Sequence, residues 1–203
     1  MTYALYVTHP QVVQDPAVPV PRWGLSERGR SRAERFANHA LVQAATRIVS
    51  SPETKALELA AILAAASGVP VESGDNFAEN DRTSTGYVGP ERFEELADAF
   101  FAEADRSTAG WETARDAQTR IVAAFEAALD GNDPTKPVIF AGHGAVGTLL
   151  KCRLGGRAIS RNEDQRRIGD PGGGNVLVIR LFDRALLTDW IAMEALPPAI
   201  AGL

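Results

Sequence analysis

Two histidines in this chain follow short apolar runs of the kind that form buried β-strands. His9 comes shortly after residues 4–7, and His143 follows residues 138–141. The carboxyl ends of parallel strands lie at one edge of a sheet, so the two imidazoles converge there if their strands are neighbours. Because a neutral imidazole is a usable nucleophile near pH 7, we expect His9 to attack phosphorus. The alternative for His9 is a histidine that only closes a strand.

Two further charged groups are expected at the same edge of the sheet. Lys55 follows a second strand and opens a helix, and Glu79 follows a third. The helix dipole disfavours a cation in the first turn by ~0.3–1 kcal/mol, which favours a nearby anion for Lys55; a lysine that reaches solvent is the alternative. A helix also begins directly after His143, and free N–H groups at a helix start bind anions. The pattern predicts an anion site.

The elements that would hold these residues alternate between strands and helices, which predicts an α/β fold with a mostly parallel sheet. Ser26 is expected to cap a helix, and the Ser51-Pro52-Glu53 segment is expected to start another, with proline at its first position. The expected strands are residues 4–7, 47–51 and 138–141, and the later helices are residues 90–101 and 111–129. A terminal hairpin of residues 176–182 and 186–193 is expected to follow.

Composition limits the class of protein. The 203 residues are 45% hydrophobic, enough for one well-filled core, and we expect a single domain over residues 1–203. A net charge of −5 argues against a nucleic-acid partner. The sequence has neither a bilayer-spanning apolar run nor a basic secretory n-region, and its single cysteine, Cys152, has no disulfide partner. We therefore expect a cytoplasmic protein with no membrane partner, no metal site and no cofactor.

Five motifs occur in an order and spacing that resemble one known family over residues 3–150. They are Thr8-His9-Pro10, Leu25-Ser26-Glu27-Arg28-Gly29-Arg30, Ser50-Ser51-Pro52-Glu53-Thr54-Lys55-Ala56-Leu57-Glu58, Phe77-Ala78-Glu79 and Gly142-His143-Gly144. The chain resembles the histidine phosphatase (phosphoglycerate-mutase-like) superfamily. The resemblance implies a three-layer α/β/α sandwich and catalytic roles for three residues. His9 would be phosphorylated, His143 would stabilise the transferring phosphoryl group, and Glu79 would protonate the leaving oxygen.

The chain departs from the family pattern at its phosphate-binding positions. The family has arginine before the nucleophile, glycine after it and usually arginine further on, where this chain has Thr8, Pro10 and Lys55. Losing one charge-assisted contact of this kind costs about 2.7–4 kcal/mol in the transition state. Arg82 is the first candidate for a replacement cation and Arg22 the second. A surface arginine that pairs with a neighbouring carboxylate is the alternative for Arg82.

These residues predict a phosphoric monoester hydrolase that acts on a small phosphorylated metabolite through a phosphohistidine. The expected phosphate-binding residues are Lys55, Arg82, Arg22 and Thr8. The expected partners are the phosphorylated substrate or inorganic phosphate. A mutase is disfavoured because few cations surround the pocket. The alternative is a catalytically weak or inactive phosphate-binding protein of the same fold. Residues 155–175 are a candidate lid or specificity loop, because long irregular loops are often functional.

A dinucleotide-binding protein is the remaining alternative, since residues 142–147 fit the G-x-G-x-x-G pattern after a strand. That fingerprint requires a second strand ending in an acidic residue about 20 residues further on. Residues 160–175 contain acidic residues but do not resemble a strand, and His143 would crowd the tight turn. The sequence therefore favours the phosphohydrolase.

Overall fold

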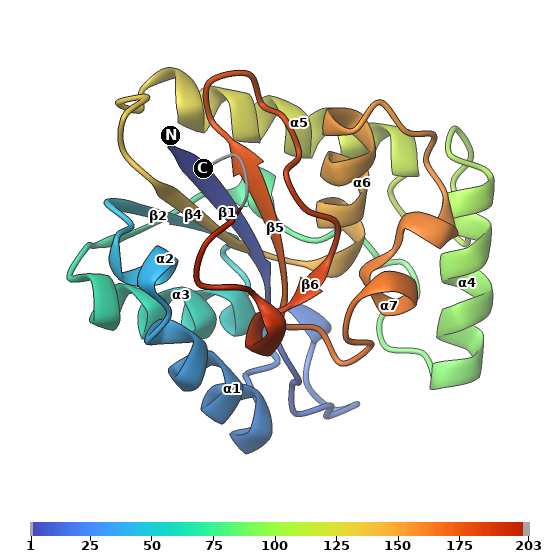
Figure 1. Cartoon of the computed structure of the whole chain (residues 1–203). Helices are drawn as coiled ribbons and strands as arrows, with labels where there is room; N and C mark the ends of the chain where they lie inside the picture. The colour runs from blue at the N-terminus through green and yellow to red at the C-terminus, as the bar shows by residue number, and fades with distance from the viewer. Residues whose placement is uncertain (1, 201–203) are drawn as a thin grey trace.

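The computed structural model describes residues 2–200 and has a six-stranded sheet at its centre. The strand order is β3-β2-β4-β1-β5-β6 (Figure 1). The strands are β1 (Tyr3–Thr8), β2 (Arg47–Ser50), β3 (Val71–Ser73), β4 (Val138–Gly142), β5 (Asn175–Arg180) and β6 (Ile191–Ala192). Strands β1 to β4 pair in parallel, and β5 runs antiparallel to both β1 and β6. The predicted α/β fold with a mostly parallel sheet is confirmed.

Helices cover both faces of the sheet (Figure 1). One face carries α1 (Glu27–Ala37), α2 (Ala40–Gln43) and α3 (Thr54–Ser67). The other carries α4 (Pro90–Ala102), α5 (Ala114–Asp130) and α6 (Gly144–Leu154), with the short α7 (Gln165–Ile168) following. Short 3-10 turns lie at Val20–Arg22, Asp75–Phe77, Arg161–Glu163 and Met193–Ala195. None of the helices within residues 2–200 combines the length and the apolar character needed to cross a bilayer.

The central strands are buried on both faces, because their side chains alternate between two hydrophobic cores. In β1, Ala4 and Tyr6 pack with α5 and α6, whereas Tyr3, Leu5 and Val7 pack with α1 and α3. The same alternation holds in β4 and β5. An uninterrupted apolar run is thus the sequence signature of a strand with helices above and below. This arrangement leaves only the strand ends for polar groups.

Two predicted element boundaries are wrong. Helix α3 does not begin at Ser51-Pro52; its N-cap is Glu53, and Ser51 stays in the loop, where its Oγ accepts a hydrogen bond from Glu53 N at 3.2 Å. The second strand of the terminal hairpin is also much shorter than residues 186–193. Only Ile191–Ala192 form a strand, and Leu186 makes an isolated bridge with Ile179. The residues between Leu186 and Ile191 do not continue the strand pairing with β5.

The start of α1 is pressed against the loop that follows β1. Ser26 caps this helix, as predicted, by accepting a hydrogen bond from Gly29 N at 3.1 Å. Ser26 N donates to Gln11 O at 2.9 Å. A Cβ added to Gly29 would lie 2.1 Å from Gln11 O, so only glycine permits this approach. The contact holds the loop after His9 against α1.

We expect Gly29→Ala to destabilise the fold by about 1–3 kcal/mol, since a backbone oxygen must move to admit the methyl group. Urea unfolding followed by circular dichroism would measure the change. The control is Gly131→Ala at the end of α5, where an added Cβ meets no atom within 4 Å, and its effect should stay within about 0.5 kcal/mol. Equal stability of the two variants would contradict this account of the loop.

Candidate active site

The two histidines lie side by side because their strands are neighbours in register. Thr8 of β1 pairs with Gly142 of β4, so His9 and His143 are the next residues of two adjacent parallel strands. His9 N donates to Gly142 O at 3.0 Å, which ties the two strand ends together. The imidazole centroids are 5.3 Å apart, with an angle of 71° between the ring planes. Parallel pairing thus creates the juxtaposition that the sequence pattern predicted.

The His9 imidazole is oriented by the backbone of the next residue. Its Nδ1 lies 2.9 Å from Pro10 O, and a carbonyl oxygen can only accept, so Nδ1 carries the proton and Nε2 carries a lone pair. Burial, and then the charge of Lys55, lower the pKa of His9 to about 4. His9 is therefore neutral at pH 7, with Nε2 in the form that a nucleophile requires.

His143 is fully buried at the N-cap of α6. Its Nε2 lies 2.7 Å from Ser51 Oγ, and its Nδ1 has no hydrogen-bond partner in the described part of the chain. Burial holds the pKa of His143 well below its usual value. A second nitrogen, Asn80 Nδ2, is also buried without a partner. Buried polar groups are rarely unpaired, so both nitrogens are candidates to donate to a bound oxyanion.

Glu79 reaches the start of α6 from the loop after β3. Its Oε1 accepts from Val146 N at 3.0 Å and its Oε2 from Ala145 N at 3.3 Å. Burial raises the pKa of Glu79, although the charge of Arg82 and the two backbone N–H groups oppose the shift. A carboxyl group with a raised pKa, close to two imidazoles, has the property that a general acid needs.

The two nearby cations differ in what they already bind. The Arg82 guanidinium lies 5.3 Å from the ring centroid of Phe93 and 5.6 Å from that of Trp111, and forms no salt bridge within residues 2–200. Lys55 Nζ is buried, donates to Val20 O at 2.9 Å and pairs with Glu53 Oε2. The Lys55 charge is thus already compensated by a carboxylate, whereas the Arg82 charge is not.

Glu53 links the parts of this site that come from separate segments. Besides Lys55, its carboxylate accepts from Glu79 N at 2.9 Å, and its Oε1 lies 3.5 Å from His143 Nε2. Burial disfavours the carboxylate form, but the charge and hydrogen bond of Lys55, together with the Glu79 N–H group, outweigh it and lower the pKa of Glu53 to about 2. Glu53 therefore stays ionised and connects the loop after β2 to the loop after β3.

The two other residues predicted to bind phosphate lie away from the open part of the site. Thr8 is fully buried; its hydroxyl donates to Gln165 Oε1 at 2.7 Å and accepts from Asn175 N at 2.9 Å. Arg22 is exposed in the 3-10 turn Val20–Arg22 and does not line the cavity beside His9. Because the Thr8 hydroxyl already binds Gln165 and Asn175, it is not available to bind phosphate. Its link to the cavity is through Gln165, which lines it.

A cavity of about 310 Å³ opens beside His9. It is lined by His9 and Glu79 of the predicted site, by Asn80, and by Gly144 and Ala145 at the start of α6. Aromatic and basic residues also line it, namely Arg82, Phe93, Phe100, Phe101, Trp111, Arg161 and Arg166. Gln165, Gly172 and Gly173 also line it, so the segment 155–175 lies against the site. No group of three or more metal-binding side chains occurs in the described residues.

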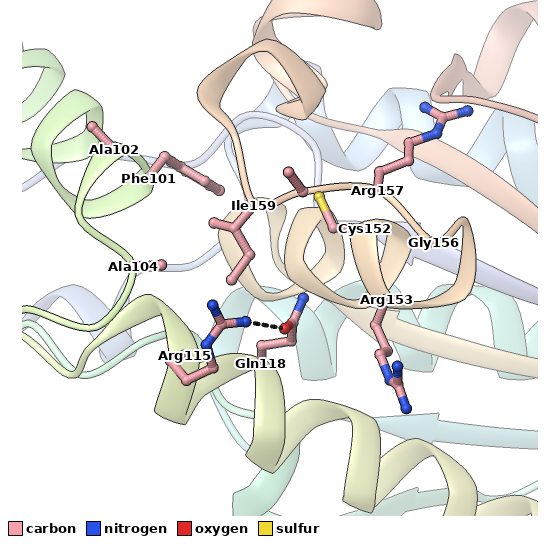
Figure 2. A pocket seen from close by; sticks show the side chains of 11 residues that line it. Phe101, Ala102, Ala104, Arg115, Gln118, Cys152, Arg153, Gly156, Arg157 and Ile159 are labelled. Atoms are coloured by element: carbon pink, nitrogen blue, oxygen red, sulfur yellow. Dashed lines mark hydrogen bonds between the residues drawn. The ribbon is translucent and has the colours of Figure 1, made fainter.

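A second cavity, of about 350 Å³, lies at the C-terminal end of α6 and shares only Phe101 with the first (Figure 2). It is lined by Arg115, Arg153 and Arg157 together with the buried Cys152. Figure 2 shows Arg153 and Arg157 directed away from the hollow, while Arg115 donates to Gln118 Oε1 at 3.2 Å. It offers no converging set of reactive groups, so the cavity beside His9 is the candidate active site.

Comparison with known proteins shows the family and the fold of the chain. The model of the histidine phosphatase superfamily (branch 1) matches residues 18–180. The chain belongs to this superfamily. The fold also resembles that of mycobacterial glucosyl-3-phosphoglycerate phosphatase, with a TM-score of 0.74 and 18% identity over 95% of this chain and 99% of that one. YhfR from Bacillus stearothermophilus gives a TM-score of 0.73 and 17% identity over 92% and 94% of the two chains. At such identities the likeness shows the fold alone.

Structures of the mycobacterial phosphatase also exist with bound anions. The complex with inorganic phosphate has a TM-score of 0.73 and 18% identity, over 96% of this chain and 99% of that chain. The complex with VO3 has a TM-score of 0.70 and 19% identity, over 88% and 92%. A comparison with curated protein sequences found no match.

Three residues of this superfamily site were not singled out from the sequence. Ser51 and Glu53 stand inside the Ser-Ser-Pro motif, which local preferences assign to a helix start, so their contacts with His143 have no local signal. Asn80 is one of many polar residues in its loop. Its burial and its unpaired nitrogen are visible only in the fold.

The pKa of His9 gives a direct test of this electrostatic picture. We expect the His9 ring to titrate near pH 4 in an NMR titration, and Lys55→Gln to raise that midpoint by removing a positive charge. Because the folded pKa lies below the unfolded value near 6.5, the unfolded chain takes up a proton at a higher pH than the folded protein does. The free energy of unfolding is therefore expected to fall as the pH drops from about 6.5 to about 4. A wild-type midpoint near 6.5 would rule out the buried, neutral His9.

Proposed function

We propose that the protein hydrolyses phosphoric monoesters of small metabolites through a phosphohistidine formed on His9. The observation that carries the proposal is the His9 ring itself. Its Nδ1 is held by Pro10 O, which leaves the Nε2 lone pair free beside His143. Glu79 and Arg82 line the cavity into which His9 opens. The site therefore offers a nucleophile, an acid and a cation for one phosphoryl group.

In the first step His9 Nε2 forms a bond to phosphorus while the ester P–O bond breaks. The leaving oxygen takes the proton of Glu79, whose raised pKa favours the protonated form. Charge on the equatorial oxygens is met by Arg82, and by the unpaired nitrogens of His143 and Asn80. Phosphoryl transfer depends mainly on positioning and charge stabilisation, which these groups provide.

In the second step water attacks the phosphohistidine. The Glu79 carboxylate takes a proton from this water as the new P–O bond forms and the P–N bond breaks. Inorganic phosphate leaves, and His9 returns to its neutral form with Nδ1 still donating to Pro10 O. The phosphate and VO3 complexes of the mycobacterial phosphatase support a phosphoryl oxyanion as the ligand of such a site. The cavity volume of about 310 Å³ supports a small substrate.

The wild-type protein is expected to show acid-labile phosphate on His9 during turnover of a phosphomonoester, measured by rapid quench and mass spectrometry. His9→Ala should abolish both the label and the hydrolysis. Glu79→Gln should lower the rate by about 10²–10⁴-fold for substrates with poor leaving groups and less for p-nitrophenyl phosphate. The control is His39→Asn, which keeps a side chain able to cap α2. Turnover that survives His9→Ala would refute the proposal.

A second candidate function is a phosphate-binding protein with little or no turnover. The pairing of Lys55 with Glu53 favours it, because the cation at this position is already neutralised, and so does the lack of arginine at Thr8. Lysine also supplies a point charge where arginine would grip phosphate through a planar fork. Binding of phosphate without hydrolysis and without a phosphohistidine would decide for this candidate.

Glu53→Gln tests whether that carboxylate competes with phosphate for Lys55. We expect the variant to bind inorganic phosphate about tenfold more tightly by isothermal titration calorimetry, as one charge-assisted contact becomes available. Glu58→Gln on the same helix, which pairs with exposed Arg30, should leave the affinity unchanged. Weaker binding by Glu53→Gln would show that Glu53 supports the phosphate site.

A further inference from the structure

The contact between Ser51 and His143 fixes more than the position of a ring. Ser51 Oγ lies 2.7 Å from His143 Nε2, and both residues are fully buried. The same Oγ accepts a hydrogen bond from Glu53 N at 3.2 Å. A serine hydroxyl has two lone pairs and one proton, and the Glu53 N–H group occupies only one lone pair. The Ser51 hydroxyl can therefore still donate its proton or accept a second hydrogen bond. The direction of the Ser51–His143 bond then depends on which nitrogen of His143 carries its proton.

Two arrangements of that proton leave different numbers of groups unpaired. If Nε2 carries it, Ser51 Oγ accepts twice, and both the serine O–H and the bare Nδ1 lack a partner in the described chain. If Nδ1 carries it, Ser51 donates to Nε2, and Nδ1–H alone is unpaired. Unpaired buried polar groups are costly, so the second arrangement is favoured.

The Glu53 carboxylate does not reverse this preference. Its Oε1 lies 3.5 Å from His143 Nε2, further than the serine oxygen, and already accepts from Glu79 N at 2.9 Å. Its other oxygen pairs with Lys55. The closest and best available partner of His143 Nε2 is therefore the serine hydroxyl.

We propose that Ser51 is a positioning residue that holds His143 in the Nδ1–H tautomer. The tautomer gives the site a neutral N–H donor at Nδ1, the ring nitrogen that has no partner within residues 2–200, for an oxygen of the phosphoryl group bound beside His9. This use of the donor rests on the proposed function. This N–H donor would help to stabilise an oxyanion in a site that has Thr8 in place of an arginine and whose Lys55 is already paired with Glu53.

The tautomer can be read directly by ¹⁵N NMR of the full chain with labelled histidine, at pH 7 and without substrate. His143 is expected to show Nδ1 as the protonated nitrogen. Ser51→Ala should move the proton wholly or partly to Nε2 and weaken inorganic phosphate binding about tenfold. Ser51→Thr, which keeps a hydroxyl, should restore both.

The matched control is Ser50→Ala. Ser50 is equally buried, but its hydroxyl donates to Ser51 O at 2.8 Å and does not contact His143. The ¹⁵N spectrum of His143 in this variant should therefore equal that of the wild type. A wild-type protein with the proton on Nε2 would overturn the inference even if no variant folds. So would a Ser51→Ala variant with unchanged phosphate affinity. Absence of turnover with the expected tautomer would instead count against the proposed hydrolase alone.

Discussion

The parallel pairing of β1 with β4 is the constraint on which the rest of the site depends. Side chains alternate along a strand, so a slip of one residue would send one of the two imidazoles to the opposite face of the sheet. The register is held beyond the ladder itself. Tyr6 Oη donates a hydrogen bond to His143 O at 3.2 Å and accepts one from His143 N at 3.2 Å. A Cβ added to Gly142 would lie 2.4 Å from Tyr6 Oη. The glycine before His143 is thus a packing requirement of the strand pair.

Burial gives this site its chemical character. It keeps His9 and His143 neutral and raises the pKa of Glu79, while Lys55 and Glu53 stay charged by pairing with each other. Charged groups inside a protein are costly unless they are paired. The charges of Lys55 and Glu53 are therefore balanced internally. Under the proposed function, an incoming phosphoryl group would meet neutral donors together with Arg82.

Part of the cavity lining consists of arginine side chains packed over aromatic rings. Arg82 lies over Phe93 and Trp111, and Arg161 lies over Phe101. Arg161 also bridges α4 to the segment after α6, through Glu94 and Asp98 on one side and Asp164 on the other. The long connection of residues 155–175 is thereby fixed against the site, with Gly174 N donating to His9 O at 3.1 Å.

The sequence by itself determined the features that depend on local periodicity and caps: the apolar strands ending at His9 and His143, the Ser26 cap, and the α/β class with helices on both faces. The order of strands and helices also predicted that Lys55 and Glu79 follow strands, at the same edge of the sheet as the two histidines. Only the tertiary structure decided that Ser51 and Glu53 leave the helix to meet His143, that Asn80 is buried, and that Thr8 is occupied by Gln165. These contacts join residues up to 157 positions apart, and hydrogen bonds over such separations depend on packing geometry that no local pattern records.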